Sequence, residues 1–406
     1  MAADIGATAP RPRKAGKKRS GAANAPARAQ AAGQSSAGSS VPPSMSDVTI
    51  RALRARPVNV PLSLPLQTSV GALDRAALVL LDLETSVGVV GRAYLFAIGE
   101  QNLKPLIALL DAMGPMIVGQ PLAPFDLERL LRARYALLGV HNLVIIAMSG
   151  IDMAVWDAHA QLLGQPLVRV LGGQVRPVRA YNSKGLGIMS KRALATQACQ
   201  LLDEGFDALK MRLGRSKASA DLAAVRAVRK AIGPDVTLMV DFNQALSLNE
   251  ARLRCRLLDE EGGLAWIEEP IRADNFEGYA ELVAVGETPI SIGENFMGPE
   301  QMAQALHARA ADFVMPDVQR IMGVSGWMRA AALAQAHDLD MSSHLFPEIS
   351  AHLLAVTPTA HWLEYVDWAN PILAEPLTIQ KGHVVIPDRP GTGVSWNEAA
   401  VARYRA

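Results

Sequence analysis

From residue 178 to residue 366 the chain repeats one pattern, in which short apolar segments alternate with amphipathic helical stretches. Each apolar segment has the length of a single strand, and the chain between two of them is long enough for a helix. We expect strands at 178–183, 208–213, 237–243, 264–270, 289–295, 312–318, 339–345 and 361–366. Eight such units in succession predict a parallel (β/α) barrel.

The segment before this repeat has a different pattern. Strand-like patches at 48–62 and 77–91 are followed by helical stretches between 101 and 165, among them 150–164. This order predicts an α+β unit ahead of the barrel. A chain of 406 residues fits a large barrel plus one smaller domain.

The first 44 residues are rich in Ala, Gly, Pro, Ser and basic residues. They contain seven Lys and Arg and one acidic residue, and almost no large apolar side chain. Such a segment cannot build a core, so we expect a disordered tail. It has no apolar run typical of a signal peptide, and its prolines fit a transit peptide poorly. We expect the tail to be dispensable, or translation to start at Met45.

Charge and cysteine content narrow the class of protein. Beyond the tail the chain contains 33 Lys and Arg and 38 Asp and Glu, and this slight excess of acidic residues argues against a nucleic-acid surface. No uninterrupted apolar run reaches the length of a membrane helix. The two cysteines, Cys199 and Cys255, form no CxxC motif and lie in helical patterns. We expect them to be buried, reduced thiols in a cytoplasmic protein.

Polar residues stand where the predicted strands stop. In a parallel barrel these positions meet at one end, which is where barrel enzymes have their active sites. The residues are Lys210, Arg212, Asp241, Asn243, Glu268, Glu294, Asp317, His344 and Glu364. Their shared position is stronger evidence for a site than any one motif.

Three of these residues are carboxylates from consecutive strands: Asp241, Glu268 and Glu294. Their charges would repel one another unless a cation lies between them. An all-oxygen ligand set favours Mg²⁺, with Mn²⁺ as an alternative, over zinc. The alternative explanation is that each carboxylate caps the helix that follows, but three matching positions favour a metal.

Two cations and one histidine complete the predicted site. Lys210 and Arg212 lie two residues apart on one strand and therefore point to the same face, where we expect an anion. His344 needs a partner that fixes its tautomer, and Asp317 on the neighbouring strand can supply it. We expect Glu364 to act as an acid of raised pKa that donates a hydrogen bond to a developing anion; the alternatives are packing and ordinary ion pairing.

Several stretches together resemble the mandelate racemase group of the enolase superfamily. They are "ALKMRLG", "MVDFNQ", "WIEEP", "GENFMGPEQM", "MPDVQRIMGVSGW" and "SSHLFPEISAHLLAVTPTAHWLE", with "IDMAVWDA" and "VIPDRPGTGVSW" in addition. The resemblance extends from about residue 48 to the C-terminus. Each motif is modest alone, but their order and spacing are specific.

The resemblance implies an α/β fold, namely a modified (β/α)₇β barrel of the TIM type with an α+β capping domain. We expect a tail at 1–45, the cap at 46–170, the barrel at 171–375 and a segment at 376–406 that returns to the cap. Family members are often homo-oligomers. The partner it implies is a small 2-hydroxy acid or acid sugar.

The resemblance also assigns roles to the residues at the strand ends. Asp241, Glu268 and Glu294 match the metal ligands, His344 with Asp317 matches the base, and Lys210 and Glu364 match residues that stabilise an enediolate. Ser183 matches a contact to the substrate carboxylate, and Asn243 a polar neighbour. An apolar pocket is implied for Leu66, Val70, Leu73, Phe96, Leu137, Leu345 and Val366.

One departure concerns the reaction. Where mandelate racemase has a second catalytic lysine, this chain has Arg212, and an arginine is protonated near neutral pH. The match and the apolar pocket slightly favour racemisation or epimerisation of a 2-hydroxy acid, while Arg212 counts against it. The alternatives are an acid-sugar dehydratase that uses His344 as base and acid, and a non-catalytic protein that binds a metal and a carboxylate.

Overall fold

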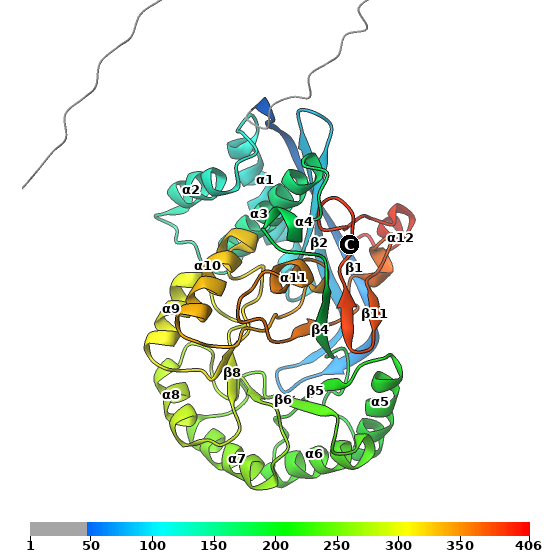
Figure 1. Cartoon of the computed structure of the whole chain (residues 1–406), viewed down its shortest axis with the longest axis vertical. Helices are drawn as coiled ribbons and strands as arrows, with labels where there is room; N and C mark the ends of the chain where they lie inside the picture. Colours follow the sequence, from blue (N-terminus) through cyan, green and yellow to red (C-terminus); the bar gives the residue numbers. More distant parts are fainter. Residues whose placement is uncertain (1–46) are drawn as a thin grey trace, which may run out of the picture. The chain divides into compact units, whose positions relative to one another are not determined.

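The computed structural model describes residues 47–406. The predictions for the tail and for a start at Met45 therefore fall outside the described residues. The described part has an antiparallel sheet with helices on one side and a parallel barrel on the other (Figure 1).

The first part of the chain forms the cap. Strands β1 (Ile50–Gln67), β2 (Ala72–Thr85) and β3 (Val90–Phe96) pair antiparallel in that order. The 3-10 helix η2 (Glu100–Asn102) and helices α1 (Leu103–Ile117), α2 (Pro124–Tyr135), α3 (Leu143–Leu162) and α4 (Leu167–Val170) follow. Buried and exposed residues alternate less along β2 than along a strand with one solvent-exposed face, because most of the second half of β2 is buried under α1 and α3.

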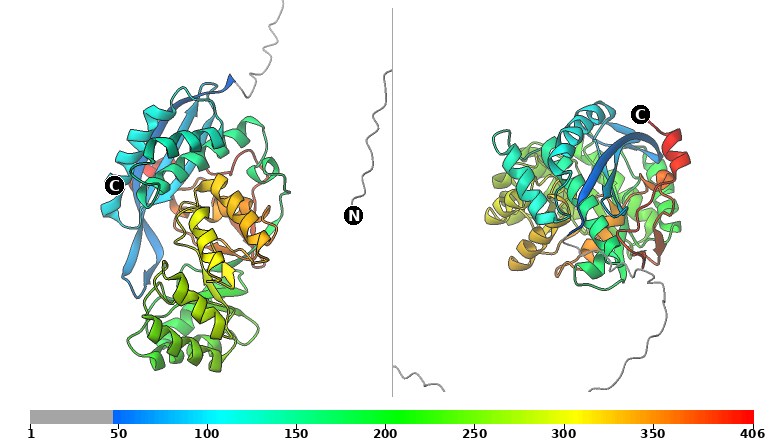
Figure 2. Two further views of the ribbon diagram at one scale, coloured as in Figure 1. Left: turned by 90° about the vertical axis from the view of Figure 1, so that its left-hand side faces the viewer. Right: turned by 90° about the horizontal axis from the view of Figure 1, so that it is seen from above.

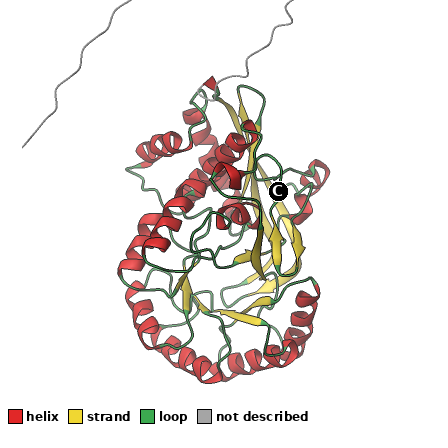
Figure 3. Cartoon of the chain, in the orientation of Figure 1, coloured by secondary structure: helices red, strands yellow, loops and turns green. Residues whose placement is uncertain are grey.

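The barrel strands are β4 (Pro177–Asn182), β5 (Ala208–Arg212), β6 (Thr237–Asp241), β7 (Ile267–Glu268), β8 (Ile290–Ile292), β9 (Phe313–Val314) and β10 (Leu363–Tyr365). They pair parallel in chain order, and β10 pairs with β4. Helices α5 (Lys191–Asp203), α6 (Ala218–Ile232), α7 (Leu248–Glu261), α8 (Phe276–Val285), α9 (Pro299–His307), α10 (Gly323–Ala336) and α11 (Pro347–Leu354) cover the outside (Figure 3). The predicted barrel with an α+β cap is confirmed.

One predicted strand does not form. Residues 339–345 make isolated bridges instead, namely Met341 with Val314 and Ala360, and His344 with Asp317. The backbone of this segment bonds to its two neighbours in turn. The N–H of Ser342 donates to the carbonyl of Val314, and the N–H of Ser343 donates to the carbonyl of Trp362. The segment therefore closes the barrel between β9 and β10 without being a regular strand.

The C-terminal segment runs back along the cap. After η3 (Asn370–Ile372), strands β11 (Thr378–Gln380) and β12 (His383–Val385) form a hairpin on β4, and α12 (Glu398–Arg403) follows. The indole of Trp396 donates to Asp82 of β2 at 2.9 Å, and Arg56 of β1 pairs with Glu398 at 2.6 Å. Figure 2 shows this segment beside the cap sheet. The exact domain boundaries stay predictions.

Two aspartates of α3 fasten the cap to the rest of the chain. Asp152 accepts hydrogen bonds from the backbone and hydroxyl of Ser325 in the first turn of α10, at 3.0 and 2.6 Å. Asp157 accepts from the backbones of Arg92 in β3 and Thr392 near the C-terminus. Helix α3 is long and apolar enough to cross a membrane by length and composition, but 83% of that window is buried inside the protein, as in a core helix.

Candidate active site

The ends of the barrel strands bring the predicted carboxylates together. Asp241 ends β6, Glu268 ends β7, and Glu294 follows β8 by two residues. One carboxylate oxygen of each lies within 4.8 Å of the others. Burial raises the pKa of Glu268. The charge of Lys210 lowers this pKa and the nearby carboxylates raise it again, so that it lies at about 8. Such crowding is unfavourable unless a cation balances it.

This donor set fits a hard divalent cation. Opposite oxygens around Mg²⁺ lie roughly 4 Å apart, close to the spread of these three ligands. All three donors are carboxylate oxygens, which Mg²⁺ and Mn²⁺ prefer. The side chain of Glu294 is 13% exposed, whereas Asp241 and Glu268 are buried, so a substrate can reach the site from the Glu294 side.

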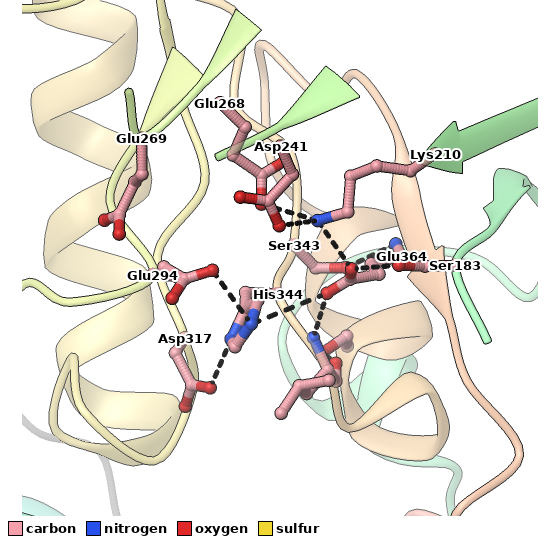
Figure 4. A network of polar contacts seen from close by, with 12 residues as sticks. Ser183, Lys210, Asp241, Glu268, Glu269, Glu294, Asp317, Ser343, His344 and Glu364 are labelled. Carbon is pink, nitrogen blue, oxygen red and sulfur yellow. Dashed lines mark hydrogen bonds and ion pairs between the residues drawn. The ribbon is translucent and has the colours of Figure 1, made fainter. Parts of the chain in front are cut away.

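Lys210 lies against two of these carboxylates. Its Nζ is 2.5 Å from Glu268 Oε1, 3.6 Å from Asp241 Oδ2 and 2.8 Å from Glu364 Oε1 (Figure 4). The side chain is completely buried. Burial lowers its pKa, but the three carboxylates outweigh burial and raise it. Lys210 is therefore a fixed positive charge.

His344 faces the carboxylates from the other side. Its Nδ1 lies 2.6 Å from Asp317 Oδ2, and its Nε2 lies 3.3 Å from Glu294 and 3.8 Å from Glu364. Asp317 is fully buried and fixes the tautomer in which Nδ1 carries the proton. Burial lowers the pKa of His344, but the charges of Glu294 and Glu364 and the bond to Asp317 raise it to about 9.

Glu364 differs from the expected neutral acid. Its Oε1 accepts from Lys210 and from the Ser183 hydroxyl at 2.7 Å, and its Oε2 accepts from the Leu345 backbone at 2.9 Å. Burial raises its pKa, but the charges of Lys210, His344 and Arg212 lower it below the ordinary value. The prediction of a raised pKa is therefore wrong, because three cations surround this carboxylate.

Arg212 is buried at the end of β5. Its Nε lies 3.3 Å from Asp241 Oδ2, and its Nη2 donates to the Ser183 hydroxyl at 3.1 Å. Nε and Nη1 are buried without a hydrogen-bond partner among residues 47–406. Burial lowers its pKa, and the carboxylates of Asp241, Glu364 and Glu268 raise it overall. The guanidinium lines the cavity and has donors left for an anionic ligand.

A cavity of about 500 Å³ opens above these groups. Arg212, Asp241, Asn243, Glu294 and His344 form its floor. Its walls are largely apolar and come from the cap and from two barrel segments. They include Leu66, Val70, Leu73, Phe96, Ile98, Leu345 and Trp368.

Two residues predicted for this pocket lie elsewhere. Leu137 is fully exposed in the connection between α2 and α3, and that connection lines a different crevice against α9. Val366 is buried in the hydrophobic core behind β10. The resemblance placed both by position in the sequence, which does not determine the path of a loop or the side of a strand.

The tip of the β1–β2 hairpin covers the cavity. Ser69 donates to the carbonyl of Phe242 at 2.9 Å, next to Asp241, and Ile188 donates to the carbonyl of Gln67 at 2.6 Å. A Cβ on Gly187 would lie 2.7 Å from the carbonyl oxygen of Gln67 and 2.8 Å from its nitrogen. Glycine is therefore required where the hairpin approaches the barrel backbone.

Several residues of the site were not predicted. Asn295 donates to both oxygens of Glu269 and to Glu294, and it accepts from Arg320, which also lines the cavity. Glu269 and Asn295 stand directly beside the predicted ligands Glu268 and Glu294, a signal that could have been used. Gln319 likewise follows the predicted Asp317 by two residues, but its side-chain contact with Phe96 is distant in the sequence, and Trp368 had no nearby signal.

Comparison with known families decides the relationship. Residues 193–400 match the enolase C-terminal domain-like model, and residues 50–172 match the N-terminal domain model of mandelate racemase and muconate lactonizing enzyme. The chain belongs to the mandelate racemase/muconate lactonizing enzyme family. The functions of its relatives differ from one another.

Two solved structures and one curated relative illustrate this range within the family. An enolase from the alpha proteobacterium bal199 with bound magnesium is 47% identical, with a TM-score of 0.87, over 88% of this chain and 100% of that chain. A Bradyrhizobium enolase complexed with magnesium and mandelic acid is 42% identical, with a TM-score of 0.85, over 88% and 99%. The L-talarate/galactarate dehydratase of Salmonella typhimurium is 34% identical over 65% of this chain and 67% of its own length.

Proposed function

We propose that this protein is a Mg²⁺-dependent enzyme that removes the α-proton of a 2-hydroxy carboxylate, with His344 as the base. The observation that carries the proposal is the contact of His344 with the buried Asp317 on one nitrogen, while its other nitrogen points to the carboxylate cluster. A protein that only binds a carboxylate has no need for an oriented base. The magnesium bound in two similar structures supports the cofactor.

We assign the metal to Asp241, Glu268 and Glu294. A Mg²⁺ ion held there would polarise the substrate carboxylate and so acidify the proton next to it. Glu294, 3.3 Å from His344 Nε2, would then have its charge balanced by the metal, and His344 would be available as a neutral base near neutral pH.

The remaining polar residues act on the substrate and on the negative charge that develops. Arg212 has free donors for the substrate carboxylate, and Ser183 holds this guanidinium in place. Lys210 keeps a positive charge beside Glu268 and Glu364. Charges that are fixed before the reaction stabilise an enediolate without reorganisation, which is usually the largest catalytic effect. Asn243 lines the floor as a further polar contact.

Of the two candidate reactions, dehydration and racemisation, the geometry favours the one that a single base can complete. Lys210 and Arg212 are the cationic groups opposite His344. A guanidinium keeps its proton near neutral pH, and Lys210 Nζ is completely buried against Glu268 and Glu364, so neither is placed to accept the α-proton. With a 2,3-dihydroxy acid, the Cα–H bond breaks towards His344, and its electron pair moves towards the carboxylate to give the enediolate. The Cβ–O bond then breaks as the Cα–Cβ double bond forms, the hydroxyl leaves as water with the proton from His344, and the resulting enol tautomerises to a 2-oxo acid. We therefore propose dehydration.

Racemisation of a 2-hydroxy acid is the second candidate. It is favoured by the apolar walls formed by Val70, Phe96 and Leu345, which suit an aryl or alkyl substituent better than a polyol. The similar Bradyrhizobium structure with mandelic acid supports it as well. This reaction requires a proton donor and acceptor on the side of Arg212.

Incubation in D₂O with Mg²⁺ distinguishes the two reactions. For dehydration we expect loss of one water from 2,3-dihydroxy acids, and exchange of only one enantiomer of simple 2-hydroxy acids. Arg212→Lys should raise exchange of the other enantiomer, because a lysine gives up its proton more readily than an arginine does. Similar exchange of both enantiomers by the wild type would establish racemisation. No exchange and no dehydration with any acid would contradict the proposal.

The location and assembly of the enzyme stay proposals. We propose a cytoplasmic homo-oligomer. Both cysteines are free thiols, although Cys199 is exposed and not buried as predicted, because it lies on the outer side of α5. The exposed Leu137 and Leu138 support an assembly contact.

A further inference from the structure

Gln319 connects the apolar wall of the cavity to the base. It is completely buried, two residues after Asp317 in the turn that follows β9. Its side-chain Oε1 accepts from the backbone N–H of Phe96 at 3.0 Å, and its Nε2 donates to the carbonyl of the same residue at 3.3 Å. The side-chain amide therefore pairs with the end of β3 as a neighbouring strand would.

The other end of this connection is the base. The backbone N–H of Gln319 donates to Asp317 Oδ1 at 2.7 Å, while Asp317 Oδ2 holds His344. The ring of Phe96 lies on the cavity wall and packs against Trp368, with 5.1 Å between the ring centroids. One residue thus contacts both the strand that carries the substrate wall and the carboxylate that orients the base.

The chemistry of the side chain makes this link specific. A buried backbone N–H and C=O both need partners, and the side-chain amide of glutamine supplies an acceptor and a donor on two separate atoms without adding a charge. Methionine has a similar length and volume but forms neither bond. The substitution Gln319→Met therefore removes the link with little change in packing.

We infer that Gln319 is a positioning residue that couples the fit of the substrate substituent against Phe96 to the orientation of the Asp317–His344 base. This inference rests on the proposed function. It explains how a wall supplied by the cap can affect catalysis on the barrel: a substituent that seats correctly against Phe96 keeps Gln319, and with it Asp317, in place.

A matched control lies at the other end of the same strand. Gln161 donates to the carbonyl of Val90, the first residue of β3, at 2.9 Å, and to Asp157 at 2.6 Å. Gln161→Met also removes a side-chain bond to the backbone of β3, but the bonds of Gln161 go to Val90 and Asp157 and not to Phe96 or Asp317. Both variants should lower the melting temperature.

The test compares mandelate and lactate, which differ only in the substituent. For the Mg²⁺-loaded wild type and both variants, calorimetry gives the two dissociation constants, and D₂O exchange gives kcat and KM. With Gln319→Met we expect the preference for mandelate over lactate to change, and kcat for exchange to fall by about tenfold or more, since small displacements of a catalytic group have large effects. Gln161→Met should change neither.

A purely structural role gives a different result. If both variants lose similar stability and keep the wild-type preference and kcat, the inference is overturned. Gln319→Glu, which keeps the acceptor for Phe96 N–H, serves if the methionine variant does not fold, and it should show the same change.

Failure of the proposed function can be recognised separately. A wild type that neither exchanges nor dehydrates any 2-hydroxy acid contradicts that function. The inference is then decided by a crystal structure of Gln319→Met: displacement of both the Phe96 ring and the Asp317 carboxylate supports it, and unchanged positions of both overturn it.

Discussion

His344 and His352 lie at the two ends of one short segment, and their surroundings shift their pKa values in opposite directions. His344 lies among Asp317, Glu294 and Glu364, and these carboxylates raise its pKa to about 9. His352 is completely buried at the end of α11, where Nδ1 accepts from the Val168 backbone. Its Nε2 donates to the carbonyl of Thr392, and burial lowers its pKa to about 4.

The difference shows that burial alone does not set the state of a histidine. Charged partners convert a buried histidine into a proton carrier, whereas backbone partners keep it neutral and structural. The two regions also differ in backbone strain. Leu345 and Phe346, directly after His344, both have positive φ values, of 50° and 48°. Such strain is typical of functional sites and requires support from the surrounding structure.

Removal of the metal is the strongest test of the region around His344. Treatment with EDTA should abolish exchange and dehydration, and Mg²⁺ should restore them. Glu294→Gln should lower activity at least about 10³-fold, because the metal stabilises the developing charge by several kcal/mol. Circular dichroism should show that the variant is folded. Full activity after exhaustive chelation would contradict the metal site.

Substitution of each of the two histidines tests their different roles directly. His344→Asn should lower α-proton exchange by about 10²- to 10⁴-fold, the usual contribution of a general base. His352→Gln should leave exchange within about twofold, because an amide can replace both of its hydrogen bonds. The measurement is exchange in D₂O by mass spectrometry. Equal losses in both variants would show that the comparison between the two sites is wrong.

The stability of the protein should depend on pH through His352. Between about pH 6.5 and 4 the unfolded chain binds a proton at this residue and the folded protein does not, so stability falls as the pH falls. By about pH 4, the neutral state of His352 has lowered the free energy of unfolding of the wild type by about 3 kcal/mol. Melting temperatures of wild type and His352→Gln should converge near pH 7 and diverge below pH 6. Parallel curves would show that His352 titrates normally.

A third histidine should show the smallest effect. His361 packs against Phe313, with ring centroids 4.9 Å apart, and its Nδ1 is buried without a hydrogen-bond partner within residues 47–406. His361→Phe should leave activity unchanged and stability equal or higher by up to about 1 kcal/mol, because it removes an unsatisfied polar atom. Thermal unfolding and exchange assays test this. A large loss of activity would place His361 in the site.

The repeat of the sequence was sufficient for the barrel and for the gathering of the polar residues. Parallel strands that follow one another along the chain place their carboxyl ends at one edge. For this reason Asp241, Glu268, Glu294, Asp317 and His344 could be grouped from their positions in the sequence alone. The irregular segment at 339–345 escaped prediction because its backbone alternates between two neighbours.

Only the tertiary structure determined the charge state and the surroundings of these residues. Glu364 is an ionised acceptor because Lys210 and Arg212 of β5 and His344 of the segment 339–345 meet around it. Leu137 lies outside the cavity, and Gln319 reaches Phe96 across the boundary between cap and barrel. The sequence determines which residues share an end of the barrel, since this follows from local periodicity and strand direction. Electrostatic environment and packing depend on distances between segments far apart in the chain, and only the folded structure brings those segments together.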